Sequence, residues 1–373
     1  MKKLIVKAED KAYRVIIGKD SFSYLTAEIR KKGLYENIFI ITDKNIWKLF
    51  SGKILNWTTT ASFSKVNVYK MNPGESSKSY LELNRIYSSL LDNNYSRDTL
   101  ILAVGGGVTG DLAGFAASTF MRGVQLVHVP TTLLADVDSA IGGKTGINFN
   151  HTKNMIGTFY QPELVLIDTE FLSTLQEREI TSGIGEIIKY AFISTPDFFD
   201  FVFKNLDNIY SKNAAVLEKV IYESVIFKAS VVSNDEKESG LRKILNFGHT
   251  FSHAYESVLK FNVKHGEAVI AGIISALYLS NICGFLSKDT LDEFLSKLLF
   301  IKLPAALNKL NKESVYNFMM KDKKNKDGKI RFILLKDIGE VAADVESGKK
   351  EIFAAINSAV MFLKNRHSVL KNL

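Results

Sequence analysis

The feature that most constrains this chain is a run of five apolar residues that stops at three consecutive glycines. The run covers residues 100–104, and Gly105, Gly106 and Gly107 follow it directly. A short unbroken apolar run is typical of a strand buried on both faces, as in a parallel sheet. Glycine then lets the backbone turn sharply and approach a ligand closely, because it has no Cβ. The sequence therefore predicts a central parallel strand whose carboxyl end meets a tight turn.

The glycines at this turn also fit a dinucleotide-binding pattern. Gly105, Gly107 and Gly110 have the spacing G-x-G-x-x-G, and a segment compatible with a helix follows them. The N-terminus of such a helix would direct its free N–H groups at a phosphate. A turn needed only for tight helix–sheet packing would have the same glycines. The acid that usually ends the next strand is absent, since residues 124–129 run into Pro-Thr-Thr. On this pattern alone, phosphate binding and packing remain equally open.

Strands and helices alternate in the first half of the chain. We expect strands at residues 37–42, 66–71, 100–104, 124–129 and 164–168. This alternation predicts an α/β domain with a parallel sheet over residues 1–176, whereas helical patterns dominate residues 177–373. Ligands of such sheets bind beyond the carboxyl ends of the strands. Asp43, Glu75, the glycine turn and Thr131-Thr132 all follow predicted strands, so they could share one crevice.

Three of the six histidines fall within a short segment. His249 and His253 are four residues apart and so share a helix face, and His265 follows. Glu186 and Lys189 lie one turn apart on an earlier predicted helix. A catalytic zinc ion commonly has three N/O ligands from the protein, which Glu186, His249 and His265 could supply if their helices converge. Histidines that are simply hydrogen-bonded in the core would fit the sequence equally well. The His-Glu-x-x-His motif of zinc proteases is absent.

Composition limits the partners and the compartment. The chain has 48 Lys+Arg against 40 Asp+Glu, a net charge of +8, and its lysines are scattered. This suits an anionic small substrate and falls short of a nucleic-acid surface. The single cysteine, Cys283, excludes an intrachain disulfide and favours a reducing compartment. No signal-peptide core follows Met1. The uncharged segment 268–286 is expected to be a buried helix rather than a membrane span.

Lys228 falls on the apolar stripe of a helix expected at residues 214–232. A lysine in such a place usually extends its charged end to solvent. The alternative is a lysine directed into a closed pocket, and the position alone leaves both open.

Taken together, the motifs resemble the 3-dehydroquinate synthase family of sugar-phosphate cyclases, in register from about residue 40 to 335. They are GGGVTGD at 105–111, FMRG at 120–123, PTTLL at 130–134, DSAIGGKTGIN at 138–148, KN at 153–154, GTFYQP at 157–162, GEIIKY at 185–190, LNFGHTFSHA at 245–254 and HGEAV at 265–269.

The resemblance implies an N-terminal Rossmann-like NAD-binding domain and an all-α C-terminal domain that binds metal and substrate. The family uses NAD and zinc, with cobalt as an alternative, in the cleft between the domains. It cyclises 3-deoxy-D-arabino-heptulosonate 7-phosphate to 3-dehydroquinate with release of phosphate, in the shikimate pathway of aromatic amino acid biosynthesis. A cytoplasmic homodimer is expected, with no nucleic-acid or membrane partner.

The resemblance also assigns roles to residues. Those implied to contact NAD are Asp43, Glu75, Lys78, Gly106, Gly107, Val108, Thr109, Gly110, Asp111, Thr131, Thr132, Lys144, Lys153, Phe171 and Thr174. Those implied to ligate the metal are Glu186, His249 and His265. Those implied to bind the substrate phosphate are Arg122 (reaching in from the neighbouring subunit), Lys144, Asn154, Asn246 and Lys323 or Lys324. The remaining catalytic positions are Asp138, Lys189, Lys228, Glu238, Arg242 and His253.

Three other readings remain. A related cyclase such as 2-deoxy-scyllo-inosose synthase would have the same fold and cofactors, although Asn154, Lys228, Asn246 and His253 favour 3-dehydroquinate synthase. A polyol dehydrogenase of the glycerol dehydrogenase type would release NADH. A non-catalytic nucleotide-binding protein would do neither.

Overall fold

The computed structural model describes residues 1–9, 11–31, 33, 37–150, 152–237, 240–260, 262–321 and 329–371. Its contacts divide the chain into two compact units. The first unit contains Met1–Leu175 and Lys212–Lys237, and the second contains Gln176–Ser211 and Glu238–Leu373. Helix α8 (Ala214–Asn234) thus belongs to the first unit, although it lies in the range that the sequence assigned to the helical domain. It packs on strand β1 and on the short helix η4 (Ala135–Ser139) of that unit.

The first unit is built on a sheet with the strand order β1-β2-β9-β6-β5-β3-β4. Strand β1 pairs antiparallel with β2, and every other neighbouring pair in this order is parallel. This confirms the predicted Rossmann-like parallel-sheet fold of the N-terminal region. The strands are β1 (Lys2–Lys7), β2 (Ala12–Gly18), β3 (Asn37–Asp43), β4 (Lys65–Met71), β5 (Thr99–Gly105), β6 (Gln125–Pro130) and β9 (Leu164–Asp168).

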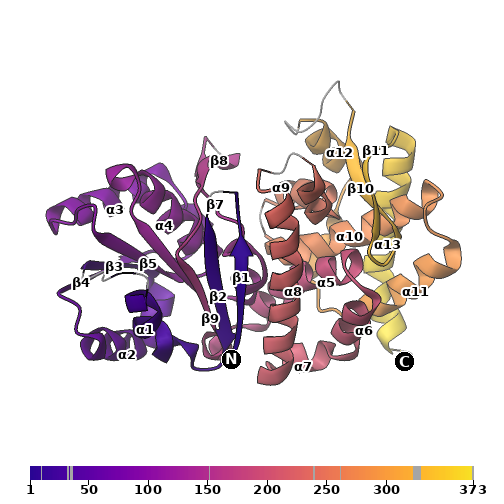
Figure 1. The fold of residues 1–373 in the computed structure, drawn as a ribbon. Helices are drawn as coiled ribbons and strands as arrows, with labels where there is room; N and C mark the ends of the chain where they lie inside the picture. The colour runs from indigo at the N-terminus through magenta and orange to yellow at the C-terminus, as the bar shows by residue number, and fades with distance from the viewer. Residues whose placement is uncertain are drawn as a thin grey trace. The chain divides into compact units, whose positions relative to one another are not determined.

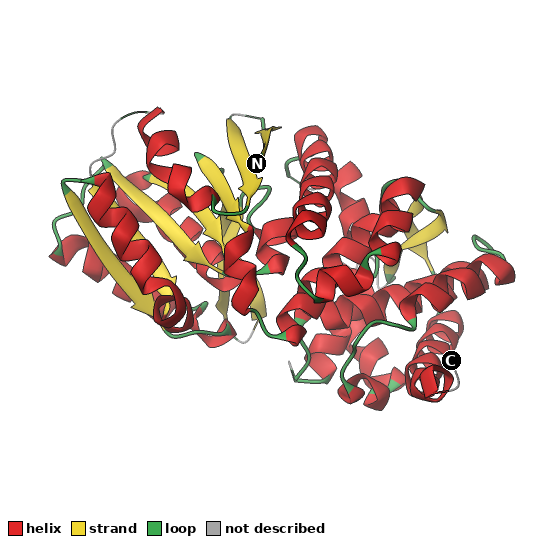
Figure 2. Ribbon diagram, turned by 90° about the horizontal axis from the view of Figure 1, so that it is seen from below, coloured by secondary structure: helices red, strands yellow, loops and turns green. Residues whose placement is uncertain are grey.

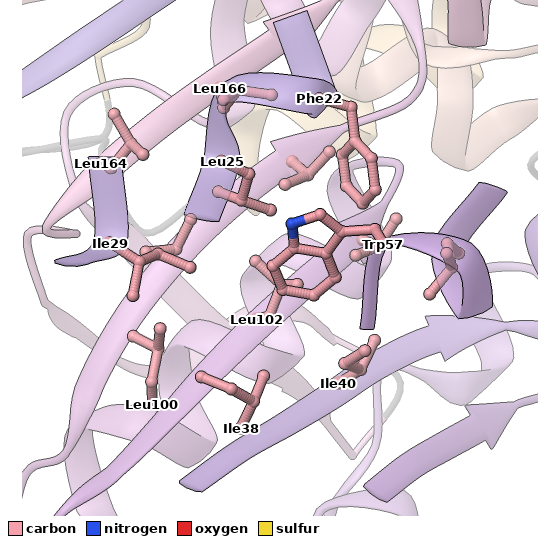
Figure 3. Close-up of a cluster of buried hydrophobic side chains, with 14 of the residues drawn as sticks. Phe22, Leu25, Ile29, Ile38, Ile40, Trp57, Leu100, Leu102, Leu164 and Leu166 are labelled. Atoms are coloured by element: carbon pink, nitrogen blue, oxygen red, sulfur yellow. The ribbon is translucent and has the colours of Figure 1, made fainter. Parts of the chain in front are cut away.

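Helices cover both faces of this sheet, as Figures 1 and 2 show. Alternate residues of β3 and β5 point to opposite faces, so each strand contributes to two apolar clusters. One face packs on α1 (Leu25–Lys31) and α2 (Lys44–Ala61), where Trp57 lies among Leu25, Ile40 and Leu102 (Figure 3). The other face packs on α3 (Tyr80–Asp92) and α4 (Gly107–Thr119). Burial on both faces explains why the central strands have unbroken apolar sequences.

A separate hairpin of the first unit consists of β7 (Lys144–Phe149) and β8 (Thr152–Phe159). Its register shifts between Ile147 and Phe149, as in a β-bulge. The apolar-run argument did not predict this hairpin, because β8 is exposed along nearly its whole length.

The second unit is mostly helical, as predicted, and contains one two-stranded antiparallel sheet (Figure 2). Its helices are α5 (Glu177–Ile193), α6 (Pro196–Lys204), α7 (Leu206–Tyr210), α9 (His249–Val258), α10 (His265–Ile282), α11 (Lys288–Leu298), α12 (Lys312–Met320) and α13 (Lys349–Lys371). Strands β10 (Arg331–Asp337) and β11 (Glu340–Glu346) form the sheet. Helix α10 is buried on almost every side, as predicted for the uncharged segment. Within the described chain, no helix has both the length and the apolar character needed to cross a bilayer.

Candidate cofactor and metal sites

The glycine turn of the first unit joins the end of β5 to the start of α4. A Cβ at Gly105 would lie 2.5 Å from Thr109 Oγ1, and one at Gly106 would lie 3.0 Å from Thr132 Cγ2. These glycines are therefore needed for packing. The turn also leaves the N-terminus of α4 at the carboxyl edge of the sheet. Phosphate binding, the other function considered for these glycines, is therefore compatible with the same geometry.

The two threonines after β6 lie beside this turn. The Thr131 amide donates a hydrogen bond to the carbonyl of Gly105 at 3.1 Å, and Thr132 Oγ1 accepts one from the Ala135 amide at 3.2 Å. Thr131 Oγ1 is buried and has no hydrogen-bond partner among the described residues. A buried hydroxyl without a partner is unfavourable, and a ligand that hydrogen-bonds to it would remove that penalty.

A polar cluster connects four of the predicted residues. Lys78, which is almost fully buried, donates through Nζ to Asp111 Oδ2 and to Asn154 Oδ1. Glu75 Oε1 accepts a hydrogen bond from Asn148 Nδ2 at 2.8 Å. Burial raises the pKa of Asp111, and Lys78 only partly opposes the shift. The structure therefore groups residues assigned to NAD with one assigned to phosphate, and Asn148 was not predicted.

Lys228 is buried and paired. From α8 its Nζ donates to the backbone carbonyl and to Oδ1 of Asp138, each at 2.6 Å. Its side chain is 7% exposed. Its charged end therefore does not extend to solvent, and the structure brings together two of the residues assigned to catalysis.

Other predicted residues of the first unit have structural contacts or lie on the surface. Asp43 caps α2, since its Oδ1 accepts from the amides of Asn45 and Ile46 at 2.8 and 3.1 Å. Phe171 is packed in the core against Phe22 and Phe50. Thr174 donates a hydrogen bond through Oγ1 to the carbonyl oxygen of Phe171, and Lys153 lies on β8. Lys144 and Arg122 are exposed. The Arg122 backbone has a φ of +67°.

The predicted metal ligands converge in the second unit. Glu186 on α5, His249 at the start of α9 and His265 at the start of α10 each offer a ligand atom, and these atoms lie within 4.8 Å of one another. His265 Nε2 is 3.1 Å from Glu186 Oε1, and His249 Nε2 is 3.5 Å from the same oxygen. Glu186 is completely buried. One carboxylate and two imidazoles form an N/O donor set of the kind that holds zinc.

Glycines allow the three helices to approach this closely. A Cβ on Gly185 would collide with the carbonyl oxygen of Gly266, and one on Gly272 with the carbonyl oxygen of Gly248. Helix α10 thus meets α5 and α9 through backbone contacts next to each ligand residue. Convergence of ligands that are 63 and 79 residues apart in sequence depends on these contacts.

Hydrogen bonds orient both histidine rings. His249 Nδ1 lies 3.2 Å from the carbonyl oxygen of Phe247, and His265 Nδ1 lies 3.4 Å from Glu256 Oε2. Both rings therefore present Nε2 to Glu186. Such contacts of the second ring nitrogen commonly fix the tautomer and the orientation of metal-binding histidines. We did not predict Glu256, but it lies three residues after His253 on the same helix face, which is a usable signal.

The charges of this cluster are strongly coupled. Burial alone would raise the pKa of Glu186, but Lys189 and the histidines outweigh it and hold the pKa well below its usual range. Burial lowers the pKa of His249. Burial would also lower that of His265, but hydrogen bonds to Glu186 and Glu256 outweigh it and raise the pKa to about 10. Lys189, 2% exposed, forms an ion pair with Glu186. Without metal, the site therefore favours a cationic His265 beside an ionised Glu186.

The remaining predicted residues of the second unit differ in how they relate to this cluster. The ring of His253 lies 5.4 Å from that of His249 and 6.5 Å from that of His265, measured between centroids. Arg242 is buried and Asn246 half-buried on the short helix η6 (Leu241–Asn246). Glu238, Lys323 and Lys324 lie outside the described residues.

A second acidic group, Asp20, Asp168 and Glu170, also has ligand atoms within 4.8 Å of one another. Lys53 Nζ contacts all three, at 3.7, 2.8 and 2.5 Å. The lysine already supplies the positive charge there, so this group is not a metal candidate.

Comparison with known proteins identifies the family. Residues 68–182 match the family model of the 3-dehydroquinate synthase N-terminal domain, and residues 183–325 match that of the C-terminal domain. The chain is 40% identical over 357 residues to a 3-dehydroquinate synthase of Pelagibacter ubique, an alignment that covers 94% of this chain and 96% of that protein.

This chain belongs to the 3-dehydroquinate synthase family.

Solved structures of other cyclases share the fold of this 3-dehydroquinate synthase family member. A 2-deoxy-scyllo-inosose synthase complexed with carbaglucose-6-phosphate, NAD+ and Co2+ superposes with a TM-score of 0.88 at 25% identity, covering 96% of this chain and 99% of that chain. A 2-epi-5-epi-valiolone synthase from Streptomyces hygroscopicus with NAD+ and Zn2+ bound has a TM-score of 0.85 at 25% identity and the same coverage. The higher identity to 3-dehydroquinate synthases separates this chain from those cyclases.

Proposed function

We propose that this protein is a 3-dehydroquinate synthase, which converts 3-deoxy-D-arabino-heptulosonate 7-phosphate to 3-dehydroquinate and phosphate using NAD and a divalent metal. One observation carries the proposal. Glu186, His249 and His265 converge within ligand distance in a chain that is 40% identical, over nearly its whole length, to a 3-dehydroquinate synthase.

The residues of the second unit fit the proposed metal. The donor set is one carboxylate and two imidazole nitrogens, which suits zinc and also cobalt once His265 has released its proton. When bound, such an ion supplies Lewis acidity that lowers the pKa of a substrate hydroxyl. Lys189 balances the charge of Glu186, and Phe247 and Glu256 hold the two rings with Nε2 facing the site. We assign metal binding to the second unit, which contains all three proposed ligands.

The residues of the first unit fit the proposed dinucleotide. The N-terminus of α4 would hold the pyrophosphate, and Thr131 Oγ1 would gain the hydrogen-bond partner that it lacks among the described residues. Bound NAD supplies an acceptor that takes a hydride and returns it, so the cyclisation needs no net oxidant. We assign NAD binding to the first unit. Asp43 and Phe171 would serve the site mainly through the cap and the core packing described above.

The cationic and amide side chains assigned to the substrate suit an anionic ligand. We propose that Lys228, Arg242, Asn154, Asn246 and Arg122 bind its phosphate and carboxylate groups. Lys228 would be held in position by Asp138, with which it already pairs. His253 is the proposed proton relay, because either nitrogen of its imidazole can carry a proton. Its ring stands beside those of the two proposed ligands.

We also propose a homodimer that works in the cytoplasm. The large apolar residues Met155, Ile156 and Phe159 are exposed on β8, and Met121 is exposed next to Arg122. A cluster of exposed apolar side chains is typical of a protein interface. Light scattering after size-exclusion chromatography would give twice the monomer mass of 41.7 kDa if this assembly forms.

A substrate panel tests the proposed activity. The metal- and NAD-loaded protein is incubated with the heptulosonate phosphate, glucose 6-phosphate or glycerol, and phosphate, dehydroquinate and NADH are measured. We expect phosphate and dehydroquinate in equal amounts from the heptulosonate phosphate alone. Phosphate from glucose 6-phosphate instead would indicate a different cyclase, and NADH accumulating with glycerol would indicate a dehydrogenase. No reaction with any of them would support a non-catalytic role.

A further inference from the structure

Asn148 lies where three segments of the first unit meet. It is on β7, at the point where the register with β8 shifts. A β-bulge of this kind turns a residue away from its regular partner. Asn148 forms instead an isolated parallel bridge with Ser79. Its backbone N–H donates a hydrogen bond to the carbonyl oxygen of Lys78 at 2.8 Å. The hairpin is thereby attached to the segment that carries Glu75 and Lys78.

The side chain of Asn148 uses both ends of its amide. Nδ2 donates to Glu75 Oε1 at 2.8 Å, and Oδ1 accepts from the backbone N–H of Asn154 at 3.0 Å. Only this orientation satisfies both neighbours, because a carboxylate requires a donor and an N–H requires an acceptor. Asn154 has a φ of +55°, in the left-handed region, which asparagine adopts more readily than most residues other than glycine.

Lys78 forms a second link between Asn154 and a residue assigned to the dinucleotide. Its Nζ donates to Asn154 Oδ1 and to Asp111 Oδ2. Asn148 and Lys78 therefore hold Asn154 through its backbone and its side chain respectively. The same two residues are bonded to Glu75 and Asp111, both of which are assigned to the dinucleotide.

We infer that Asn148 is a positioning residue that couples the dinucleotide site to the phosphate site, so that NAD binding strengthens phosphate binding. The inference rests on the proposed function, which assigns Glu75 and Lys78 to NAD and Asn154 to the substrate phosphate. A ligand that orders Glu75 orders Asn154 through Asn148, and a ligand that orders Lys78 acts on Asn154 directly. By linkage, phosphate must strengthen NAD binding by the same factor.

Two substitutions distinguish the roles of the two hydrogen bonds that the Asn148 side chain makes. Asn148→Ala removes both side-chain hydrogen bonds. Asn148→Asp keeps an acceptor for the Asn154 amide, removes the donor, and puts a second carboxylate against Glu75. Thr152→Ala is the matched control, because Thr152 is exposed on the same hairpin and, among the described residues, its Oγ1 donates to the Asn150 carbonyl. Far-UV circular dichroism checks that each variant is folded.

Binding of NAD and of inorganic phosphate is measured by calorimetry, each with and without the other. In the wild type and in Thr152→Ala, we expect NAD to lower the dissociation constant of phosphate roughly five-fold or more, within the usual range of coupling. In Asn148→Ala the factor should fall at least about two-fold, and the direct hydrogen bond between Lys78 and Asn154 carries what remains. Asn148→Asp should weaken NAD binding at least about ten-fold while its phosphate affinity without NAD stays within about two-fold, because carboxylate repulsion acts only on the Glu75 side.

Two outcomes overturn the inference, namely an unchanged coupling factor in a folded Asn148→Ala variant, or equal weakening of both ligands by Asn148→Asp. A wild type that binds both ligands without coupling also contradicts it. If Asn148→Ala does not fold, the test rests on Asn148→Asp, in which NAD binding should weaken while phosphate binding without NAD stays nearly unchanged. Since the readout is binding, a wild type that binds with coupling but forms no dehydroquinate would refute the proposed function and leave the inference standing.

Discussion

The ion pair between Glu186 and Lys189 leads to a double-mutant test of the proposed metal site. Both side chains are buried, at 0% and 2% exposure, one turn apart on α5. Replacing Glu186 by Gln keeps the shape, removes the negative charge and leaves the Lys189 ammonium in the interior without its partner. Removing one member of a buried pair typically costs about 3–5 kcal/mol. We expect Glu186→Gln to lower the free energy of unfolding of the metal-free protein by that amount.

The double variant Glu186→Gln with Lys189→Met should recover most of this loss. Replacing both charges of a buried pair by neutral groups of similar volume is often neutral or stabilising. We expect the double variant to lie within about 1 kcal/mol of the wild type in metal-free buffer. Neither variant should gain stability from zinc, because both lack the carboxylate ligand. The wild type should gain about 2.7 kcal/mol when free zinc is a hundred times its dissociation constant.

The assay is urea unfolding at pH 7, with and without chelator, followed by circular dichroism at the helical band. This signal is needed because both tryptophans, Trp47 and Trp57, lie in the first unit and their fluorescence does not report on the helical one. The slope of the free energy against urea must stay constant for the values to be compared. A Glu186→Gln variant within 1 kcal/mol of the wild type would refute the reasoning, as would a double variant no more stable than the single one.

Three further predictions concern other buried groups. Glu256→Gln should weaken zinc binding by about ten-fold, because it removes the charge that orients His265; a competing chelator measures this, and unchanged affinity would contradict the role. Gly185→Ala should weaken zinc binding too, since its Cβ would push against Gly266 and separate α5 from α10, and tighter binding would show that the helices need not touch. Burial lowers the pKa of His128 to about 4, so it contributes stability that is present above pH 6.5 and is lost as the pH falls to 4. That contribution is at most about 3 kcal/mol; His128→Gln should flatten urea stability between pH 7 and 4.5, and a slope as steep as that of the wild type would contradict this.

The parallel strands could be predicted because burial on both faces leaves an unbroken apolar run. Residues 100–104 and 164–168 have this pattern, and β5 and β9 include them. Strands β1 and β8 did not give this signal, because the residues of β1 largely alternate and those of β8 are almost all exposed. The sequence therefore predicted the centre of the sheet and the edge strand β4, but missed the opposite edge formed by β1 and β2.

The metal ligands could be chosen from the sequence by residue type, but their convergence could not. It depends on backbone contacts between Gly185 and Gly266 and between Gly248 and Gly272, which are far apart in the chain. Glu256 was missed because its role appears only when α10 brings His265 beside it. Roles taken from motifs likewise did not show that Asp43 caps a helix or that Phe171 is packed in the core.

The central claim is that the protein recycles NAD while it eliminates phosphate, and its most direct test uses NAD in limiting amount. The metal-loaded protein is mixed with one equivalent of NAD and a hundred equivalents of 3-deoxy-D-arabino-heptulosonate 7-phosphate, while phosphate and absorbance at the NADH band are recorded together. We predict that phosphate release continues far beyond one equivalent, matched by dehydroquinate, with no net NADH. Phosphate release that stops at one equivalent, or NADH that accumulates in step with product, would contradict the account.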